Sequence, residues 1–487
     1  MSANCAAFDL GASSGRLILG SFQDGTIKIK EIHRFKNSFF EKNGSYFWDT
    51  GLIFAEMLAG MEKLGALGAA VDSMAIDTWG VDYAVLDAAG DRVFDVYSYR
   101  DHRTDNTMDE LFRLAGKEYI FGKTGLLFAQ YNTIFQLYEH IKSDPAGFKK
   151  AKTLLMLPDY LSFLFSGVIA AEYTEATTTQ LINIAENDWD ADLLRLIGAD
   201  RAMFPAIVKP GTALGGISDG LRIKARFPRT KVIAAASHDT ASAVVSAPLT
   251  SKDSVFISSG TWSVLGFESE KPLTGQTVMR HNFSNEGGAA GVNLLKNIIG
   301  LWLIQEVQRI LGADYSIQRL VELAEAEIKS GRGLSFVNPD NPRFLNPDDM
   351  AAEIKGCCAG TGQAVPGTPG EIAACVFASL AMQYRRALSE IEDIRGSKAD
   401  VVNIVGGGSQ NGLLNQLCAD YTGCAVHAGP VESSALGNIA VQLVALGEIA
   451  SIREARRIIA DSFEIRKYSP NPRPDIERDY AKFVSLP

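Results

Sequence analysis

Cysteine is scarce in this sequence, with six among 487 residues, and no two of them form a Cys-x-x-Cys pair. So few thiols in a chain of this length do not build a disulfide framework, and the missing pair spacing argues against a structural zinc site. We therefore expect reduced thiols in a cytoplasmic protein. Pairing of Cys358 with Cys375, or of Cys418 with Cys424, stays open because spacing along the chain does not fix distance in space.

The sequence also lacks long apolar runs and a basic surface. No apolar run reaches the length of a membrane span, and no signal peptide pattern follows Met1. The net charge is −10 and Lys and Arg form no cluster, which argues against a nucleic-acid surface. We expect neither a membrane nor a nucleic acid as a partner, and the oligomeric state, monomer or dimer, stays open.

The remaining composition is typical of a globular enzyme, with 46% hydrophobic and 21% charged residues. A chain of 487 residues is too long for one ordinary core, so we expect two or more domains.

Two predicted strand pairs surround small, hydroxylated turns. Strands at 6–10 and 17–22 enclose the first turn, and strands at 254–258 and 262–267 enclose the second. Small residues leave backbone N–H groups accessible, so such turns can hold phosphate groups. The first is not a P-loop, because a strand follows it and no Gly-Lys-Ser/Thr is present. An ordinary tight hairpin is the alternative. Asp9, at the end of the first strand, could hold a hydrated Mg²⁺.

Asp239 follows a predicted buried strand at Val232–Ala236 and precedes a predicted helix that starts at Ala241. Ligands of α/β folds bind at the edge where strands pass into helices. A carboxylate there could take a proton from a substrate hydroxyl, and His238 beside it could orient that substrate. The alternative is that Asp239 only caps the helix, since Asp is favoured at that position.

A second strand, loop and helix of this kind are predicted at Val401–Val405, Gly406–Asn411 and Gly412–Tyr421. Together with the two hairpins, this repetition indicates an internal duplication. The predicted fold class is α/β, with two duplicated domains at 1–247 and 248–487. We expect the catalytic cleft between the two domains.

Several further elements are expected along the chain. We predict helices at 52–67, 119–138 and 158–167, and a Thr-rich loop at 174–179. Trp79, Trp262 and Trp302 are expected to be core or wall aromatics more than stacking platforms. Arg100 and Arg103 belong either to structural ion pairs or to a site.

The arrangement of phosphate-sized hairpins, an Asp loop and a Gly-Gly-Gly loop resembles the actin–hexokinase–Hsp70 class of ATP-binding folds, with two ribonuclease-H-like (actin-like ATPase) domains. Within that class the sequence resembles the FGGY carbohydrate kinases over its whole length, and the segments 76–83 and 237–240 are most similar to the members that phosphorylate L-rhamnulose. The matching segments are Asp9–Arg16, Ile76–Tyr83, Tyr99–Thr104, Ser237–Ser242, Ile257–Ser263, Asn285–Gly288, Leu295–Leu303, Gly406–Asn411 and Ala428–Glu432.

The resemblance implies a role for each matching residue. The N-terminal domain would carry sugar binding, the first phosphate hairpin and the catalytic Asp, and the C-terminal domain would carry nucleotide binding. Asp239 would be the catalytic base. The residues expected to bind the ketose are Gly80, His238, Asp239, Thr240 and Asn297. The residues expected to bind ATP are Ala12, Ser13, Ser14, Gly15, Arg16, Thr261, Gln305 and Gly407. Asp9 would be associated with Mg²⁺, through water.

The implied reaction is the ATP-dependent phosphorylation of the 1-hydroxyl of L-rhamnulose to L-rhamnulose 1-phosphate, in L-rhamnose catabolism. A related ketose, L-fuculose or L-xylulose, is the alternative substrate. An ATP-gated clamp and a catalytically dead sugar sensor are alternatives from other classes. The segments Leu126–Tyr131 and Ala289–Asn293 depart from the family pattern and could alter which sugar fits.

Overall fold

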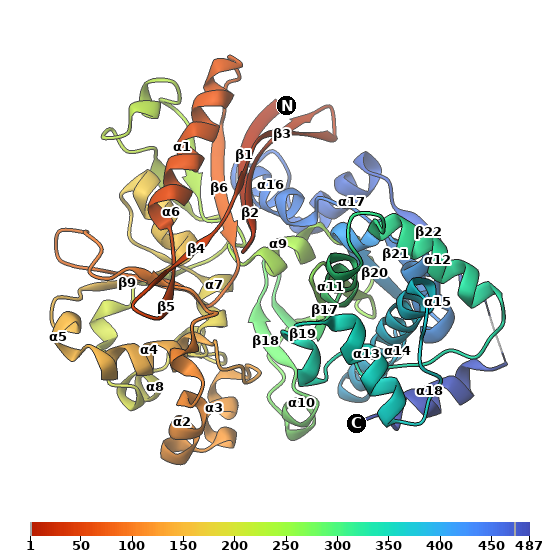
Figure 1. Cartoon of the computed structure of the whole chain (residues 1–487). Helices are drawn as coiled ribbons and strands as arrows, with labels where there is room; N and C mark the ends of the chain where they lie inside the picture. Colours follow the sequence, from red (N-terminus) through yellow and green to blue (C-terminus); the bar gives the residue numbers. More distant parts are fainter. Residues whose placement is uncertain (1, 472–473) are drawn as a thin grey trace. The chain divides into compact units, whose positions relative to one another are not determined.

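The computed structural model describes residues 2–471 and 474–487, and its contacts divide the chain into two compact units (Figure 1). The first unit comprises Met1–Ser246, Glu268–Leu294 and Ser433–Ser462, and the second comprises Ala247–Phe267, Leu295–Glu432 and Phe463–Pro487. Within the described ranges, no helix is both long and apolar enough to cross a membrane. All six cysteines lie in these ranges and are free thiols.

The first unit is built on a six-stranded sheet with the order β14-β15-β6-β1-β2-β3. Its strands are β1 (Ser2–Leu10), β2 (Ser14–Gln23), β3 (Thr26–Lys36), β6 (Ser73–Thr78), β14 (Ala213–Gly216) and β15 (Lys231–Ile233). The antiparallel pairing of β1 with β2 confirms the first predicted hairpin. β6 runs parallel to β1 and β15 runs parallel to β6, so three strands end at one edge of the sheet.

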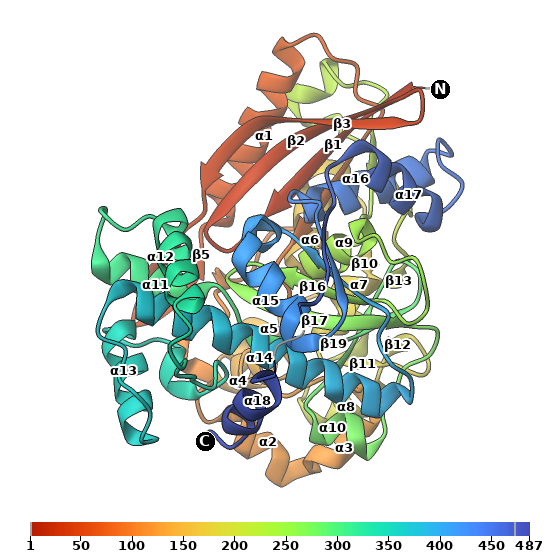
Figure 2. The same ribbon diagram turned by 90° about the vertical axis from the view of Figure 1, so that its right-hand side faces the viewer.

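Helices cover both faces of this sheet. The helices α1 (Thr50–Ala66) and α6 (Leu157–Ser166) bury one face, where the rings of Phe8 and Phe165 stack at 5.9 Å between centroids. The helices α9 (Asp239–Ser246) and α16 (Ser433–Ala445) pack with the strands on the other face, and α17 (Ile452–Ser462) contacts β3. Figure 2 shows β1–β3 with α1 on one side and α16 and α17 on the other.

Smaller elements complete the first unit around a second apolar core. Its short strands are β4 (Phe39–Lys42), β5 (Ser45–Trp48), β7 (Tyr83–Leu86), β8 (Val96–Tyr97), β9 (Thr153–Met156), β10 (Ala171–Glu172), β11 (Ile182–Asn183), β12 (Asp188–Trp189) and β13 (Ile207–Val208). Its helices are α2 (Thr107–Ala115), α3 (Lys117–Thr124), α4 (Thr133–Ser143), α5 (Pro145–Phe148), α7 (Tyr173–Thr178), α8 (Ala191–Leu196) and α10 (Gln276–Arg280).

Three local predictions for the first unit are wrong. The helix expected at 119–138 is two helices, α3 and α4, because α3 ends at Gly125 in the left-handed region with φ +61°. The Thr-rich loop is the helix α7, which Glu172 caps by accepting hydrogen bonds from the N–H groups of Thr174 and Glu175. The strand expected at 232–236 ends at Ile233, although the following residues remain buried.

A seven-stranded sheet has the order β18-β19-β17-β16-β20-β21-β22. Its strands are β16 (Val255–Ser259), β17 (Trp262–Ser269), β18 (Ser284–Gly287), β19 (Val292–Ile299), β20 (Val401–Val405), β21 (Ala425–Ala428) and β22 (Arg466–Tyr468). β16 pairs antiparallel with β17 and parallel with β20, which repeats the arrangement of β1 with β2 and β6. The repeated pairing confirms the predicted duplication and the second hairpin.

The helices of the second unit include the long, buried α14, which begins with a capping box at Thr368 and Glu371. The helices are α11 (Trp302–Leu311), α12 (Ile317–Lys329), α13 (Met350–Gly360), α14 (Pro369–Arg395), α15 (Gly412–Thr422) and α18 (Ile476–Val484). β20 and α15 have the bounds that the sequence predicted to within one residue. A short 3₁₀ turn at Gly407–Gln410 joins them.

Candidate active site

Carboxylates gather at the edge of the first sheet where its parallel strands end. Asp9 and Asp77 are register partners on the neighbouring strands β1 and β6, so their side chains lie on the same face. Thr78, the last residue of β6, pairs with His238 in an isolated parallel bridge. The backbone thereby brings Asp9, Asp77 and the loop that carries Asp239 to one edge, the usual place for ligands in such sheets.

Asp239 is the first helical residue of α9. The first helical hydrogen bond runs from the N–H of Ser242 to the carbonyl of His238, at 3.0 Å, so His238 and not Asp239 occupies the cap position. The side chain of Asp239 keeps 34% of its surface exposed, and the hydroxyl of Thr240 donates to it at 3.3 Å. Burial and the nearby charge of Asp9 raise the pKa of Asp239, while His238 opposes this rise.

Asp9 and Asp77, the other two carboxylates at this edge, have different partners: a cation for Asp9 and a neutral amide for Asp77. Arg16 forms an ion pair with Asp9 across the β1–β2 hairpin. Asp77 is fully buried and accepts a hydrogen bond from the side-chain amide of Asn438 at 2.6 Å. Burial, with the charges of Asp9 and Asp239, raises the pKa of Asp77 well above its usual range. The edge therefore carries more negative charge than its own cations neutralise.

Carboxylate oxygens are the ligands that Mg²⁺ prefers, and Mg²⁺ commonly binds one or two of them while keeping several waters. Among the residues that the structure describes, no group of three or more potential ligands forms a metal site. A divalent cation near Asp9 would therefore be held by few protein atoms. The excess negative charge at this edge fits such an ion.

The turn of the first hairpin is closed by its own backbone. The N–H of Gly11 donates to the carbonyl of Ser14 at 2.9 Å, and Asn37 holds the carbonyls of Gly11 and Ser13. Within the described chain, no hydrogen bond engages the N–H groups of Ala12 and Ser13, which leaves them for an anion.

Gly15 has a packing role in this hairpin. It is buried, and a Cβ at this position would lie 2.3 Å from the ring of Phe35 on β3. A glycine is therefore needed here for the strands to pack, whatever the turn binds.

Gly80 lies in a strained loop that contacts α7. A Cβ on Gly80 would lie 3.0 Å from the Thr178 side chain. The next residue, Val81, has φ +72°, which is rare for a β-branched residue and is typical of functional sites. The N–H of Val81 donates to the hydroxyl of Thr178 at 3.1 Å, and its carbonyl accepts from Thr133 at 2.7 Å.

The loop that precedes Asp239 is held by the other end of α7. The carboxylate of Glu172 accepts a hydrogen bond from the N–H of Ser237 at 3.1 Å, and the hydroxyl of Thr174 accepts from the N–H of His238 at 3.2 Å. The helix α7 thus fixes both the Gly80 loop and the Asp239 loop. This helix was not predicted from the sequence, because its cap, Glu172, is not one of the residue types favoured at that position.

His238 has a second carboxylate beside it that the sequence analysis left without a role. Its Nδ1 lies 3.1 Å from Oε2 of Glu286 on β18, and its Nε2 lies 3.6 Å from Oδ1 of Asp239. Burial disfavours the charged imidazole, but Glu286, Asp239 and Glu172 outweigh it and raise the pKa of His238. His238 and Glu286 therefore add two ionisable groups to the site that contains Asp239.

Aromatic and cationic groups near this edge support the fold. The indole N–H groups of Trp48 and Trp79 donate to Asp82 at 2.6 and 2.8 Å, and burial raises the pKa of Asp82 to about 6. Trp79 is therefore a core residue, as expected. Arg103 forms a 3.2 Å ion pair with the buried Asp101, which supports the structural alternative for this residue.

In the second unit, the hairpin tip lies beside the start of α11. The N–H groups of Gly300 and Trp302 donate to the carbonyl of Thr261 at 3.1 Å each, and the Thr261 hydroxyl donates to the side chain of Gln305 at 3.3 Å. Both Thr261 and Gln305 are exposed. The structure therefore brings together two of the residues expected along the nucleotide.

The Gly-Gly-Gly loop of the second unit meets both the hairpin and a cavity. A Cβ on Gly408 would lie 2.0 Å from Oγ of Ser259, so Gly408 packs directly on the end of β16. Gly407, by contrast, has open space where a Cβ would project. Gly407 and Leu301 line a cavity of about 810 Å³.

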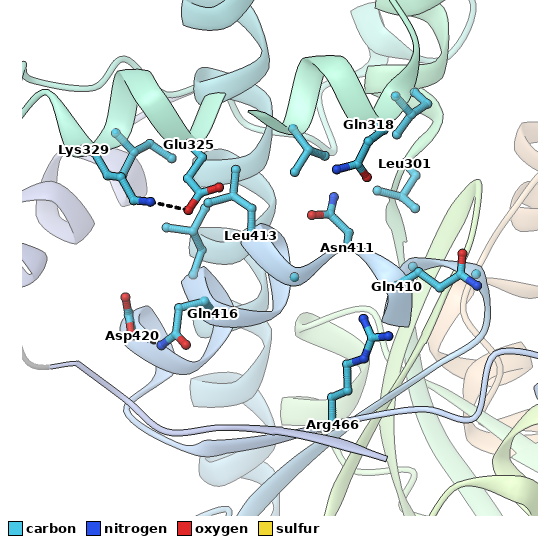
Figure 3. A pocket seen from close by; sticks show the side chains of 17 residues that line it. Leu301, Gln318, Glu325, Lys329, Gln410, Asn411, Leu413, Gln416, Asp420 and Arg466 are labelled. Carbon is cyan, nitrogen blue, oxygen red and sulfur yellow. Dashed lines mark hydrogen bonds and ion pairs between the residues drawn. The ribbon is translucent and has the colours of Figure 1, made fainter. Parts of the chain in front are cut away.

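This cavity, hereafter the α12–α15 cavity, is shown in Figure 3. Its lining residues are Leu301, Ile317, Gln318, Val321, Glu325, Ile328, Lys329, Gly407, Gly408, Gln410, Asn411, Gly412, Leu413, Gln416, Leu417, Asp420 and Arg466. Apolar side chains from α12 and α15 form its walls, and the amides of Gln318 and Asn411 project into it (Figure 3). Its size is typical of a small-molecule site, and eight of its lining residues are polar or charged.

Asn297 lies on β19 with a half-buried side chain and belongs to the second unit. The other residues expected to bind the ketose, Gly80, His238, Asp239 and Thr240, belong to the first unit.

Comparison with solved structures defines the class of the fold. The chain is similar to a xylulose kinase from Lactobacillus acidophilus, with a TM-score of 0.82 and 17% identity over 99% of this chain and 96% of that one. It is also similar to Plasmodium falciparum glycerol kinase, with a TM-score of 0.79 and 14% identity over 99% of this chain and 96% of that one. The protein has the two-domain α/β fold of these kinases, which confirms the predicted fold class.

Family models then cover most of the chain. The N-terminal domain model of the FGGY family of carbohydrate kinases matches residues 5–246, and the C-terminal domain model matches residues 255–446. The protein therefore belongs to the FGGY family of carbohydrate kinases, as the sequence resemblance predicted.

Two curated relatives are similar over almost their whole length. The rhamnulokinase of Halalkalibacterium halodurans is 46% identical over 95% of this chain and 98% of that protein. The rhamnulokinase of Bacillus subtilis is 41% identical over 97% of this chain and 96% of that protein.

Proposed function

We propose that the protein transfers the γ-phosphoryl group of ATP to the 1-hydroxyl of L-rhamnulose, giving L-rhamnulose 1-phosphate and ADP in L-rhamnose catabolism. The observation that carries the reaction type is Asp239, a partly exposed carboxylate with a raised pKa at the carboxyl edge of the first sheet. The end-to-end similarity to two rhamnulokinases supports L-rhamnulose as the sugar.

Asp239 is the proposed base that accepts the proton of the sugar hydroxyl. Its pKa is raised by burial and by Asp9, and a carboxylate with a raised pKa is a better proton acceptor. Gly80, His238, Thr240 and Asn297 are proposed to hold the ketose. Since the base acts only when ionised, phosphorylation should increase as the pH rises through the pKa of Asp239.

The nucleotide is proposed to bind the small turns and the α12–α15 cavity. The N–H groups of Ala12 and Ser13 and the turn residues Ser14 to Arg16, with Thr261, are proposed to hold the phosphates. Gln305 and Gly407 are proposed to lie along the nucleotide, next to the cavity that Gly407 lines. In functional terms, residues 1–247 would provide the sugar site, the first phosphate hairpin and the catalytic Asp239, and residues 248–487 would bind the nucleotide.

Mg²⁺ is the proposed metal, with Asp9 as its nearest protein group through water. Bound there with ATP, it would neutralise charge on the transferring phosphoryl group. Asp9 and its neighbours fit that ion because burial and their mutual negative charge raise the pKa values of Asp77 and Asp239. The ketose and ATP are the proposed partners, and the free cysteines support a cytoplasmic enzyme.

The direct test is ADP release from Mg·ATP in the presence of single ketoses, namely L-rhamnulose, L-fuculose and L-xylulose, with ATP alone as the control. Strong stimulation by L-rhamnulose, together with formation of L-rhamnulose 1-phosphate, is expected. Preferential stimulation by L-fuculose or L-xylulose would support the same kinase reaction with that ketose as the substrate. An ATPase rate that no sugar alters would refute the kinase and favour the clamp.

A further inference from the structure

The imidazole of His238 lies between two carboxylates that come from different elements. Nδ1 faces Oε2 of Glu286 at 3.1 Å, and Nε2 faces Oδ1 of Asp239 at 3.6 Å. Within the described chain, Nδ1 of His238 and Oε2 of Glu286 are both buried and neither has a hydrogen-bond partner, so their 3.1 Å approach is an ion-pair contact. Each of these two buried atoms is therefore available to the other.

Glu286 is held in place by both of its neighbours on β18. The N–H of Gly287 donates to the hydroxyl of Thr177 on α7 at 2.8 Å. The side-chain amide of Asn285 donates to the carbonyls of Gly125 and Leu273 at 2.9 Å each. Because the backbone on either side is tied, the carboxylate of Glu286 stays opposite the imidazole.

The charged groups around His238 are nearly all acidic. Glu286 faces it from β18, and Asp239 follows it in α9. The carboxylate of Glu172, at the start of α7, accepts from the neighbouring N–H of Ser237 and adds a further negative charge. Beyond Asp239 lie Asp9, paired with Arg16, and the buried Asp77. The three nearest charged groups are Glu286, Asp239 and Glu172. Each is negative and therefore favours the form of His238 that carries a proton on both ring nitrogens.

We propose that Glu286 is a positioning residue that holds the Nδ1–H of His238 and keeps the imidazole protonated, so that Nε2–H is presented to Asp239 and to an oxygen of the bound ketose. The role toward the ketose rests on the proposed function, whereas the protonated Glu286–His238 pair does not. A charged His238 stabilises the ionised form of Asp239, because an opposite charge within about 4–6 Å favours ionisation.

The pair can be tested without any substrate. In protein labelled with [¹³Cε1]histidine, each of the six histidines gives one resonance, and the variant His238→Asn identifies the one from His238. In the unaltered protein this resonance should titrate with a midpoint above about 6.5, the ordinary value for histidine. In Glu286→Gln the midpoint should fall by about 1–3 pH units, the range for loss of a close opposite charge.

The chain contains a matched control at a distance from the site. Nε2 of His33 on β3 lies 2.6 Å from Oε2 of Glu56 on α1, which is a second histidine–glutamate pair. Glu56→Gln removes a carboxylate beside another histidine and should leave the titration of His238 unchanged. Should both variants alter His238 equally, the effect would be a general change of charge or folding, and the proposal would fail.

A kinetic measurement then connects the pair with the sugar. The pH profile of kcat/KM for the ketose should lose activity at high pH as His238 loses its proton, and Glu286→Gln should move that limb about 1–3 pH units lower. An unchanged His238 titration in Glu286→Gln, or a midpoint below about 6.5 in the unaltered protein, would overturn the proposal. A normal titration in a protein that phosphorylates no ketose would instead refute only the proposed function.

Discussion

Replacing Gly407 with valine should weaken nucleotide binding and leave the fold intact. A Cβ at Gly407 meets no heavy atom within 4 Å, and its φ lies outside the left-handed region that disfavours side chains. The residue lines the α12–α15 cavity, so the added carbons would occupy space that the proposed nucleotide needs. The adjacent Gly408 shows the contrast, because a Cβ there would collide with Ser259 at 2.0 Å.

The expected magnitude follows from the cost of overfilling a packed site. Inserting extra carbon atoms where a ligand must pack typically costs about 1–3 kcal/mol. Since about 1.4 kcal/mol corresponds to a tenfold change in affinity, the Kd for ATP should rise by about 5- to 150-fold. The ketose, proposed to bind mainly through residues of the first unit, should bind with its original affinity.

Calorimetric titration of each ligand separately would measure both effects. Gly360→Val is a suitable control, because Gly360 ends α13 in the same unit, is exposed and has equally open space around a Cβ. The control should bind ATP and ketose normally. Equal losses of ATP and ketose affinity in Gly407→Val, or unchanged ATP affinity, would refute the reasoning that assigns Gly407 to the nucleotide.

Three further predictions concern the base, a buried histidine and a helix crossing. Asp239→Asn should abolish sugar phosphorylation in a coupled assay while ATP binding persists, and near-normal turnover would remove Asp239 from the mechanism. His140 is buried beside aromatic rings, and burial, with the charge of Arg103, lowers its pKa to about 3. The unfolded chain therefore binds a proton between about pH 6.5 and 3 that the folded protein does not, so folding stability falls as the pH falls, by about 2 kcal/mol at pH 5. Urea unfolding at pH 7 and pH 5 measures this effect. Between these pH values the free energy of unfolding of His140→Phe should fall by about 2 kcal/mol less than that of the unaltered protein. Equal decreases in the two proteins would contradict the lowered pKa of His140. A Cβ on Gly437 would lie 1.7 Å from the carbonyl oxygen of Ser242, so Gly437→Ala should destabilise the first unit by about 3 kcal/mol or more, and an unchanged unfolding midpoint would argue against this close crossing of α16 and α9.

Much of the fold could be predicted because it is encoded locally. The hairpin of β1 and β2 alternates apolar strands around a small-residue turn, and β20 with α15 shows a buried run followed by a glycine loop. Such patterns identify elements without knowledge of their neighbours. The repetition of these units then indicated the duplication, which strand pairing confirms.

The missed elements depend on partners that are distant in sequence or on a single residue. Threonine has low helix propensity, yet α7 forms because Glu172 caps it and Thr177, Thr178 and Thr179 donate to carbonyls one turn back. The break between α3 and α4 depends on the conformation of Gly125.

Asp239 and His238 stood out in the sequence because they follow a strand. Glu286 lies 48 residues beyond His238 along the chain, and only the fold shows that the two side chains meet at 3.1 Å.

The position of α16 has a consequence for synthesis of the protein. This helix covers one face of the first sheet, where Gln442 binds Ser73 and Asn438 binds Asp77, yet about 190 residues of chain separate it from Ser246. A ribosome adds about 5–20 residues per second, so the sheet would wait roughly 10–40 s for α16. During that interval an apolar face would be uncovered on the nascent chain. A fragment that stops at residue 247 would never gain that cover, and we expect it to aggregate or to bind chaperones.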